Sequence, residues 1–214
     1  MPPRIPPGRV GRAWLQRRLA VAHRSVDVLD QKRRALIKLE RALDEEMRET
    51  RAAWMAAAET AAEWLARAST LSGPRRLNLV AHYTPPAAID IRRENTLGVV
   101  HPSNVELSLP PRTDTVALGG SSAVASAVGA HRRALDAAAA HAAIATAHRA
   151  VSAELAATTR RARAIERRWI PMHEHALERL ELQLDEGERE DLARLRWLSP
   201  DVGATDRRDP DTGP

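Results

Sequence analysis

The 214-residue sequence contains no cysteine, no phenylalanine and a single tyrosine. Without cysteine the chain can form neither a disulfide framework nor a thiolate metal site. With so few aromatic residues, its apolar contacts must come from alanine, leucine and valine. This composition favours helices that meet along a seam over a thick globular core.

The sequence also lacks the motifs of an active site. It has no glycine-rich phosphate loop, no GxSxG, no HExxH and no cysteine nucleophile. His173 and His175 are two residues apart, so on a helix they point in nearly opposite directions and cannot chelate one ion. We therefore expect a non-enzymatic chain with no catalytic, cofactor-binding or metal-binding residues.

Membrane and export signals are missing as well. No stretch approaches the roughly 18 apolar residues that a membrane span needs. The N-terminus MPPRIPPGRV has prolines and arginines where a signal peptide needs an apolar core. These observations predict a soluble, cytoplasmic chain without direct membrane insertion.

The charge of the chain is high but nearly balanced. Lys and Arg total 33 against 28 Asp and Glu, which leaves a formal net charge of +5. Interleaved charges of both signs are typical of solvated helix faces with i,i+4 pairs. Only Lys32 and Lys38 are lysines. The planar fork of arginine favours lasting contacts with carboxylates, so arginine-rich faces also suit a protein partner.

A long apolar pattern dominates the first third of the chain. From Leu19 to Ala68, positions that alternate in steps of three and four are apolar except Arg33, Glu40 and Thr50. A mean spacing of about 3.5 residues predicts a left-handed coiled coil. We assign a first long helix to residues 9–70, after an N-terminal arm at 1–8. Its predicted seam residues are Leu19, Val26, Leu29, Leu36, Leu43, Met47, Trp54 and Trp64.

Residues 71–121 have the character of a connector. Gly73 and Pro74 should end the first helix. The strand-like stretches LNLVAHY, AIDIRR, TLGVV and VELSL follow, separated by TPPA, REN and HPSN, which resemble turns. This alternation predicts one or two small hairpins that must lean on helices or on a partner.

A second long helix is predicted at residues 122–198, followed by a disordered tail at 199–214. Its predicted seam residues are Ile144, Val151, Leu155, Ile165, Trp169 and Met172. The pattern shifts by one residue after Ala176, as in a coiled-coil stutter. Because the pattern keeps its phase through Pro171, we expect a continuous helix there with a modest bend.

The fold class that follows is mainly α. Two very long helices form an antiparallel left-handed coiled coil, with a short connector containing a β-hairpin between them. Helical rise places Trp54 opposite Ile144, Trp64 opposite Ala134 and Trp169 opposite Leu29. Large residues would then meet small or aliphatic ones along an evenly spaced seam.

The densest basic stretch is RRARAIERR, with Arg160, Arg161, Arg163, Arg167 and Arg168. Three interpretations are open: a solvated face, a face for a protein partner, or a site for nucleic acid. No aromatic residues that could stack on bases are interleaved, which disfavours nucleic acid. We take the five arginines as candidates for contact with a protein partner.

Two stretches resemble a known family. PPGRVGRAWLQRRLAVAHRSVDVLDQKRRALIKLE is similar to the N-terminal helix of the D subunit of the V-type and A-type rotary ATPases. TTRRARAIERRWIPMHEHALERLELQLDEGEREDLARLRWL resembles the closing helix of that family, with IP followed by LDEGERE in step. IDIRRENTLGVVHPSNVEL is more weakly similar to the family's strand and turn region.

The resemblance implies a central-stalk protein that acts as the rotor shaft. It would carry torque between a hexamer of catalytic A and B subunits and the membrane rotor ring. The F subunit and a socket subunit of the C or d type would be further partners. The chain would be cytoplasmic and peripheral to the membrane through the complex, with ATP chemistry and proton or sodium transport in other subunits. The alternatives are a generic coiled-coil adaptor or scaffold and, third, a nucleic-acid-binding protein.

Overall fold

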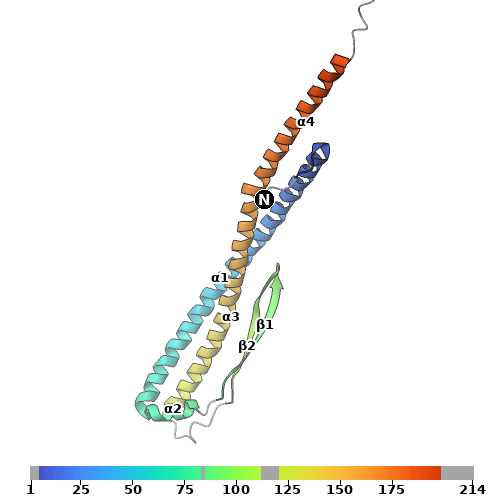
Figure 1. Ribbon diagram of the computed structural model, residues 1–214. Coiled ribbons are helices and arrows are strands. Elements are labelled where there is room, and N and C mark those ends of the chain that lie inside the picture. The colour runs from blue at the N-terminus through green and yellow to red at the C-terminus, as the bar shows by residue number, and fades with distance from the viewer. Residues whose placement is uncertain (1–4, 83–84, 112–120, 199–214) are drawn as a thin grey trace, which may run out of the picture. The chain divides into compact units, whose positions relative to one another are not determined.

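The computed structural model describes residues 5–82, 85–111 and 121–198 (Figure 1). Contacts divide the chain into two units. Met1–Val28 together with Ala162–Pro214 make up the terminal unit, and Leu29–Arg161 make up the hairpin unit. The predicted disordered tail at 199–214 lies outside the described residues, as does the predicted N-terminal arm except for residues 5–8.

Long helices make up most of both units. Helix α1 runs from Gly8 to Ser72, and the returning chain is helical from Ser122 to Leu198. The returning helix comprises α3 (Ser122–Ala164), the π-helical turn η1 (Ile165–Trp169) and α4 (Ile170–Leu198). The predicted fold class, two long packed helices joined by a connector with a hairpin, is confirmed.

In the hairpin unit α1 packs against α3 through a narrow core. Its main cluster joins Leu36 and Leu43 of α1, Ala147 and Val151 of α3, and Val99 of the connector. Leucine and valine at seam positions meet alanines, so the two helices approach closely at low volume. The apolar stripe of each helix is thereby removed from water, which is the main stabilising term here.

The connector differs from its predicted form at its start. LNLVAHY, expected as a strand, lies in helix α2 (Pro74–His82) up to its last described residue. Pro74 occupies the first position of α2, where a backbone N–H would make no hydrogen bond within the helix, so proline is tolerated there. Val80 is buried and Leu77 half-buried in a cluster with Ala68, Val124 and Ala127. Docking on α1 and α3 thus overrides the weak strand propensity of a short apolar run.

A single antiparallel hairpin completes the described part of the connector, with β1 (Ala88–Thr96) paired to β2 (Val99–Ser108). Of the expected turns, REN lies inside β1 and HPSN inside β2; the register shift at Arg92/Arg93 accommodates Pro102. The chain turns at Leu97 and Gly98, whose φ angles of 56° and 82° are both positive. A two-residue hairpin turn of this kind needs positive φ at both positions.

The terminal unit packs the start of α1 against η1 and α4. Leu19 and Ala22 contact Ile170, with Trp169 and Leu177 half-buried around them. Gly11 is required nearby, because a Cβ atom at this position would lie 1.9 Å from the carbonyl oxygen of Pro6.

Pro171 is accommodated by the π-helical turn that precedes it. The N–H of Ile170 donates to the carbonyl of Ile165, five residues back, and the chain stays helical through Pro171. Pro171 can donate no hydrogen bond, and its ring would crowd the carbonyl of Arg167 in a regular α-helix. The wider turn relieves this crowding, so a π bulge replaces the simple bend that the sequence predicts.

The bulge also changes the place at which the apolar pattern of the returning helix shifts by one residue. After Leu155, Thr158, Ala162 and Ile165, the residues that face α1 are Ile170, His173, Leu177 and Leu180. The phase therefore changes at η1 and not after Ala176 as predicted. As a result Met172 is 44% exposed, and His173, at 2%, occupies the seam instead. The extra residue of the π turn rotates Met172 away from α1.

The other predicted seam residues have graded burial. Leu19, Leu36, Leu43 and Val151 are buried, and Val26, Leu29, Met47, Trp64, Ile144, Leu155, Ile165 and Trp169 are half-buried. Trp54 is at the border of exposure, at 36%. Partial burial follows from having one partner helix, which covers each seam side chain from one side only.

The axial register differs from the prediction by about one helical turn at Trp54 and by about two turns at Trp64 and Trp169. Trp54 stacks on His141, with ring centroids 5.5 Å apart, and not on Ile144. Trp64 packs near Val124 and Ala127 instead of Ala134, and Trp169 packs near Leu19 and Ala22 instead of Leu29. The apolar pattern defines which face each helix buries, but a slip of one turn preserves that face.

Leu36, which is fully buried, tests the importance of the seam. Leu36→Ala should lower the free energy of unfolding by about 2–5 kcal/mol, because it leaves a cavity between α1 and α3. Leu71→Ala, at a 71% exposed position of the same helix, should change it by less than about 0.5 kcal/mol. Urea denaturation followed by circular dichroism measures both; equal losses would contradict this description of the core.

Candidate functional site

The candidate sites among the described residues are surfaces that a partner could contact. Within residues 5–82, 85–111 and 121–198, no group of three or more His, Asp or Glu side chains is placed to hold a metal ion. None of the described helices is long and apolar enough to cross a membrane. The candidate sites are therefore the arginine-rich segment, a partly buried ion-pair cluster and an apolar groove.

All five candidate arginines of the predicted partner face are exposed. Arg160 and Arg161 end the hairpin unit, and Arg163, Arg167 and Arg168 belong to the terminal unit. Of these five, only Arg161 makes an ion pair with a described residue, at 3.9 Å from Glu154. The other four guanidinium groups have no carboxylate partner in the described part of the chain, so they are available to one from outside.

Glu154 is the centre of a polar cluster in the seam of the hairpin unit. Its carboxylate accepts a hydrogen bond from the ammonium of Lys32 at 2.6 Å and a longer one from Thr158 at 3.4 Å. The Lys32 hydrogen bond is the main cause that holds the pKa of Glu154 below its ordinary value. Burial opposes this shift, and the charges of Lys32 and Arg161 add to it.

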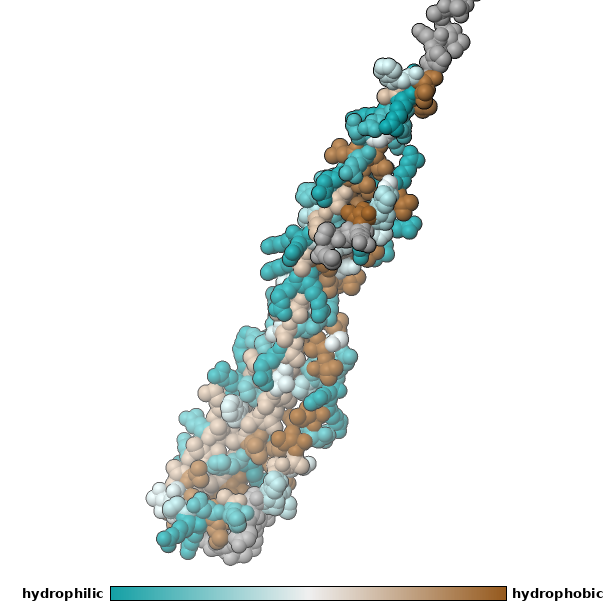
Figure 2. All heavy atoms as spheres, viewed as in Figure 1, coloured by the Kyte–Doolittle hydropathy of each residue, from teal (hydrophilic) through white to brown (hydrophobic). Residues whose placement is uncertain are grey.

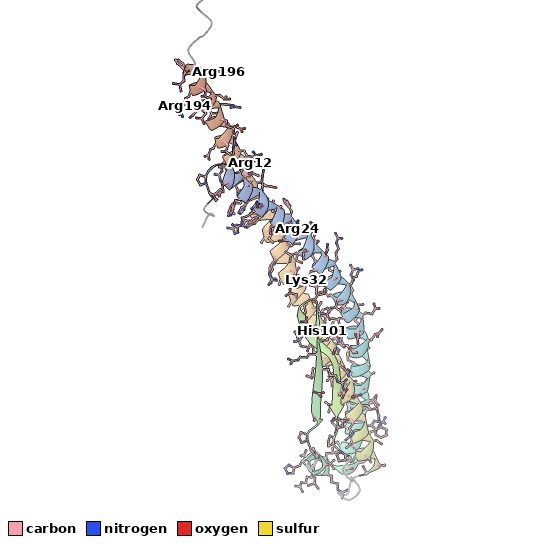
Figure 3. The ribbon with its side chains drawn as sticks, turned by 90° about the vertical axis from the view of Figure 1, so that its right-hand side faces the viewer. Arg12, Arg24, Lys32, His101, Arg194 and Arg196 are labelled. Carbon is pink, nitrogen blue, oxygen red and sulfur yellow. The ribbon has the colours of Figure 1, made fainter. Side chains whose placement is uncertain are left out.

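The tip of the hairpin lies over this cluster. A Cβ atom placed on Gly98 would be 4.0 Å from Nζ of Lys32. Next to the turn, His101 is 5% exposed, and its ring hydrogen-bonds Thr96 and the carbonyl of Pro102. Figure 3 shows Lys32 and His101 close to the same end of the hairpin. The tip therefore covers part of the Lys32–Glu154 ion pair, whose side chains remain 28% and 25% exposed.

Two further polar pairs join α1 to α3. Ser152 donates to the carboxylate of Glu40 at 2.6 Å, and Thr50 hydrogen-bonds the ring of His141 at 3.3 Å. The sequence pattern shows Glu40 and Thr50 as polar residues at seam positions but does not indicate which residues they would contact. Each forms a hydrogen bond with one specific residue of α3, so a slip of one turn would break this bond between the helices.

An apolar groove of about 400 Å³ lies in the terminal unit, and we call it the tryptophan groove. It is lined by Trp14, Arg17, Arg18, Val21, Ala22 and Ser25 of α1 and by Ile165 and Trp169 of η1. The π turn thus supplies one wall of the groove. Turns of this type are frequent at functional sites.

The guanidinium of Arg18 is held by the two indole rings of the groove. It lies 4.6 Å from the ring centroid of Trp14 and 5.9 Å from that of Trp169. In the described part of the chain neither Arg18 nor Arg17 makes an ion pair. The groove therefore combines an apolar lining with two cations that lack a counter-charge among the described residues.

His173 lies beside Trp169 and is almost fully buried. Its ring stacks on the indole with centroids 3.6 Å apart, and its Nδ1 hydrogen-bonds the carbonyl of Trp169 at 2.9 Å. Since a carbonyl only accepts, Nδ1 carries the proton. The contact fixes the indole orientation at the groove. His175, by contrast, is exposed, and it pairs with Glu178 at 3.3 Å.

The groove and the Glu154 cluster are not predicted from the sequence. Trp14 and Arg18 stand four residues apart, a spacing that brings a cation over a ring on a helix, so this half of the groove had a local signal. Trp169 and Ile165 join it only through tertiary packing. Glu154 and Lys32 are 122 residues apart, and no local pattern relates them.

Comparison with known protein families gives one finding. The family model described as the ATP synthase D subunit matches residues 13–199. The match includes α1 from Ala13 onward, the whole connector and the returning helix. A search among curated proteins found no match.

The Glu154 cluster makes the stability of the hairpin unit depend on pH. Because the folded-state pKa of Glu154 is lowered, its ion pair stabilises at neutral pH and is lost as the pH falls through that pKa, below 4.5. Glu154→Gln should cost about 1–2 kcal/mol of unfolding free energy at neutral pH, with the deficit closing in acid.

The matched control is Glu45→Gln, at an exposed position of α1 without an ion pair in the described residues. Its stability should follow that of the unmodified chain at every pH. Chemical denaturation at a series of pH values measures the difference, and a Glu154→Gln deficit that stays constant into acid would contradict the assignment.

Proposed function

Because the chain belongs to the ATP synthase D subunit family, we propose that it is the central-stalk rotor shaft of a V-type or A-type ATPase. In this function it transmits torque between the catalytic A/B hexamer and the membrane rotor ring. The observation that carries the proposal is the family match over residues 13–199, which includes both long helices of the antiparallel pair.

The seam of the hairpin unit supports a mechanical function. Torque twists two packed helices against each other and tends to slide one along the other. Sliding by one turn would keep the apolar faces together but would break the pairs of Lys32 with Glu154 and of Glu40 with Ser152. The polar pairs therefore resist a motion that apolar packing alone opposes weakly.

The surface of the shaft suits contacts that change. Figure 2 shows hydrophilic residues over much of the visible face of the helices. Charged side chains of both signs can exchange partners at low cost because exposed ion pairs are individually weak. Coupling then follows from differential binding: each nucleotide state of the hexamer favours a different angle of one stiff body.

In this proposal the chain has no reaction of its own. ATP hydrolysis or synthesis and ion movement take place in other subunits. The F subunit and a socket subunit of the C or d type are the further proposed partners, and the chain is held at the membrane only through its complex. The exposed Arg160, Arg161, Arg163, Arg167 and Arg168 are proposed to contact protein partners. The alternative, a generic coiled-coil adaptor or scaffold that is not linked to a rotary ATPase, receives no support from the family match.

Rotation separates a shaft from a static scaffold. The chain has no cysteine, so Arg75→Cys on the exposed face of α2 provides a unique label. With an immobilised A/B hexamer, a bead attached there should turn in one direction when ATP is added. The same preparation with ADP is the control. A hexamer that hydrolyses ATP around a bound but stationary chain would contradict the shaft, and absence of binding would contradict the assignment to this complex.

A further inference from the structure

The tryptophan groove is an apolar site whose cations are unpaired within the described residues. Two of its eight lining residues are arginines and none is acidic. The guanidinium of Arg18 already lies against Trp14 and Trp169, so its position is fixed before any partner arrives. Such preorganisation lowers the entropy cost of binding an anion beside the rings.

The rim of the groove has a surplus of positive charge. Arg24, labelled in Figure 3, lies between the lining residues Ala22 and Ser25 on α1 and is exposed. The nearby Arg9 and Arg12 differ from it, since they pair with Glu188 and Glu181 at 2.9 and 3.0 Å. Within the described residues of the terminal unit, Arg9 and Arg12 thus form ion pairs, whereas the arginines at the groove form none.

The apolar lining selects against a simple ion as occupant. Val21 is 62% exposed at the groove, although valine gains from burial. Tryptophan and arginine are among the residues most enriched at the energetic centres of protein interfaces. An occupant must therefore bring an apolar side chain to cover Val21 and the indole rings, and a carboxylate to meet Arg17 and Arg18.

We infer that the tryptophan groove binds an acidic segment of the catalytic hexamer at one rotational position and releases it when the shaft turns; the segment inserts a leucine or aromatic side chain between Trp14 and Trp169. The segment sets a carboxylate next to it, against Arg17 and Arg18. This inference rests on the proposed function, because it takes the hexamer as the neighbouring molecule. It goes further because it assigns one specific contact, with a stated partner chemistry, to a surface on which most charged side chains can exchange partners.

The test uses the full chain and the purified A/B hexamer, and measures the dissociation constant at several salt concentrations. Arg17→Glu with Arg18→Glu should weaken binding by about tenfold or more, because it sets like charges against the acidic segment. Arg41→Glu with Arg51→Glu makes the same charge change at two exposed positions elsewhere on α1 and should have a much smaller effect.

Val21 offers a second variant that leaves the buried core intact. Val21→Glu places a carboxylate within reach of Arg17, one turn earlier, so it should occupy the cations and weaken binding more than Val21→Gln does. Circular dichroism of the free variants checks the fold. Equal affinities of Val21→Glu, Val21→Gln and the unmodified chain would overturn the inference even if the double arginine variant misfolds.

A photoreactive residue at position 21 identifies the occupant. Crosslinking to the purified hexamer should capture a segment of a catalytic subunit that carries aspartate or glutamate beside a leucine or aromatic residue. Capture of a basic segment, or of a second copy of this chain, would overturn the inference. An unmodified chain that does not bind the hexamer contradicts the proposed function itself, whereas binding that is unaffected by the groove variants contradicts only the groove assignment.

Discussion

The packing of α1 against the returning helix is the interaction on which the other features depend. In both units the core clusters draw side chains from α1 and from the helix that returns beside it. α2 and the hairpin contribute Val80 and Val99 to clusters that these helices already form. A core made by two helices is thin, so each seam side chain packs mainly against one neighbouring helix. Stability therefore rests on many small contacts spread along the seam.

Because the apolar seam is thin, polar side chains determine the axial register of α1 against α3. Alanine-rich stretches pack acceptably in several registers because their side chains are small and alike. Glu40 with Ser152, Thr50 with His141 and Lys32 with Glu154 remove this freedom, since each would lose its hydrogen bond in another register. The same residues that cost desolvation in the seam thus oppose sliding of one helix along the other, as the proposed function as a rotor shaft requires.

Pro171 connects the fold with the candidate groove. The proline cannot follow a regular α-helical turn, and the π turn that accommodates it adds one residue to the seam. This residue brings Ile170 and His173 towards α1, turns Met172 outward and leaves Trp169 at the wall of the groove. The ring of His173, oriented by its hydrogen bond to the Trp169 carbonyl, then stacks on the indole. A local backbone requirement therefore shapes an exposed surface.

The sequence alone determined the two long helices, the position of the connector and the family resemblance, because periodicity and composition act over neighbouring residues. It predicted a strand for the segment that folds as α2, and it placed two turns where the hairpin continues. The form of the bend at Pro171, a π turn, follows from the local backbone and was not predicted, whereas the register and the groove depend on tertiary packing. The register and the groove depend on contacts such as Lys32 with Glu154 or Arg18 with Trp169, between residues more than a hundred positions apart, for which a 3.5-residue repeat carries no information.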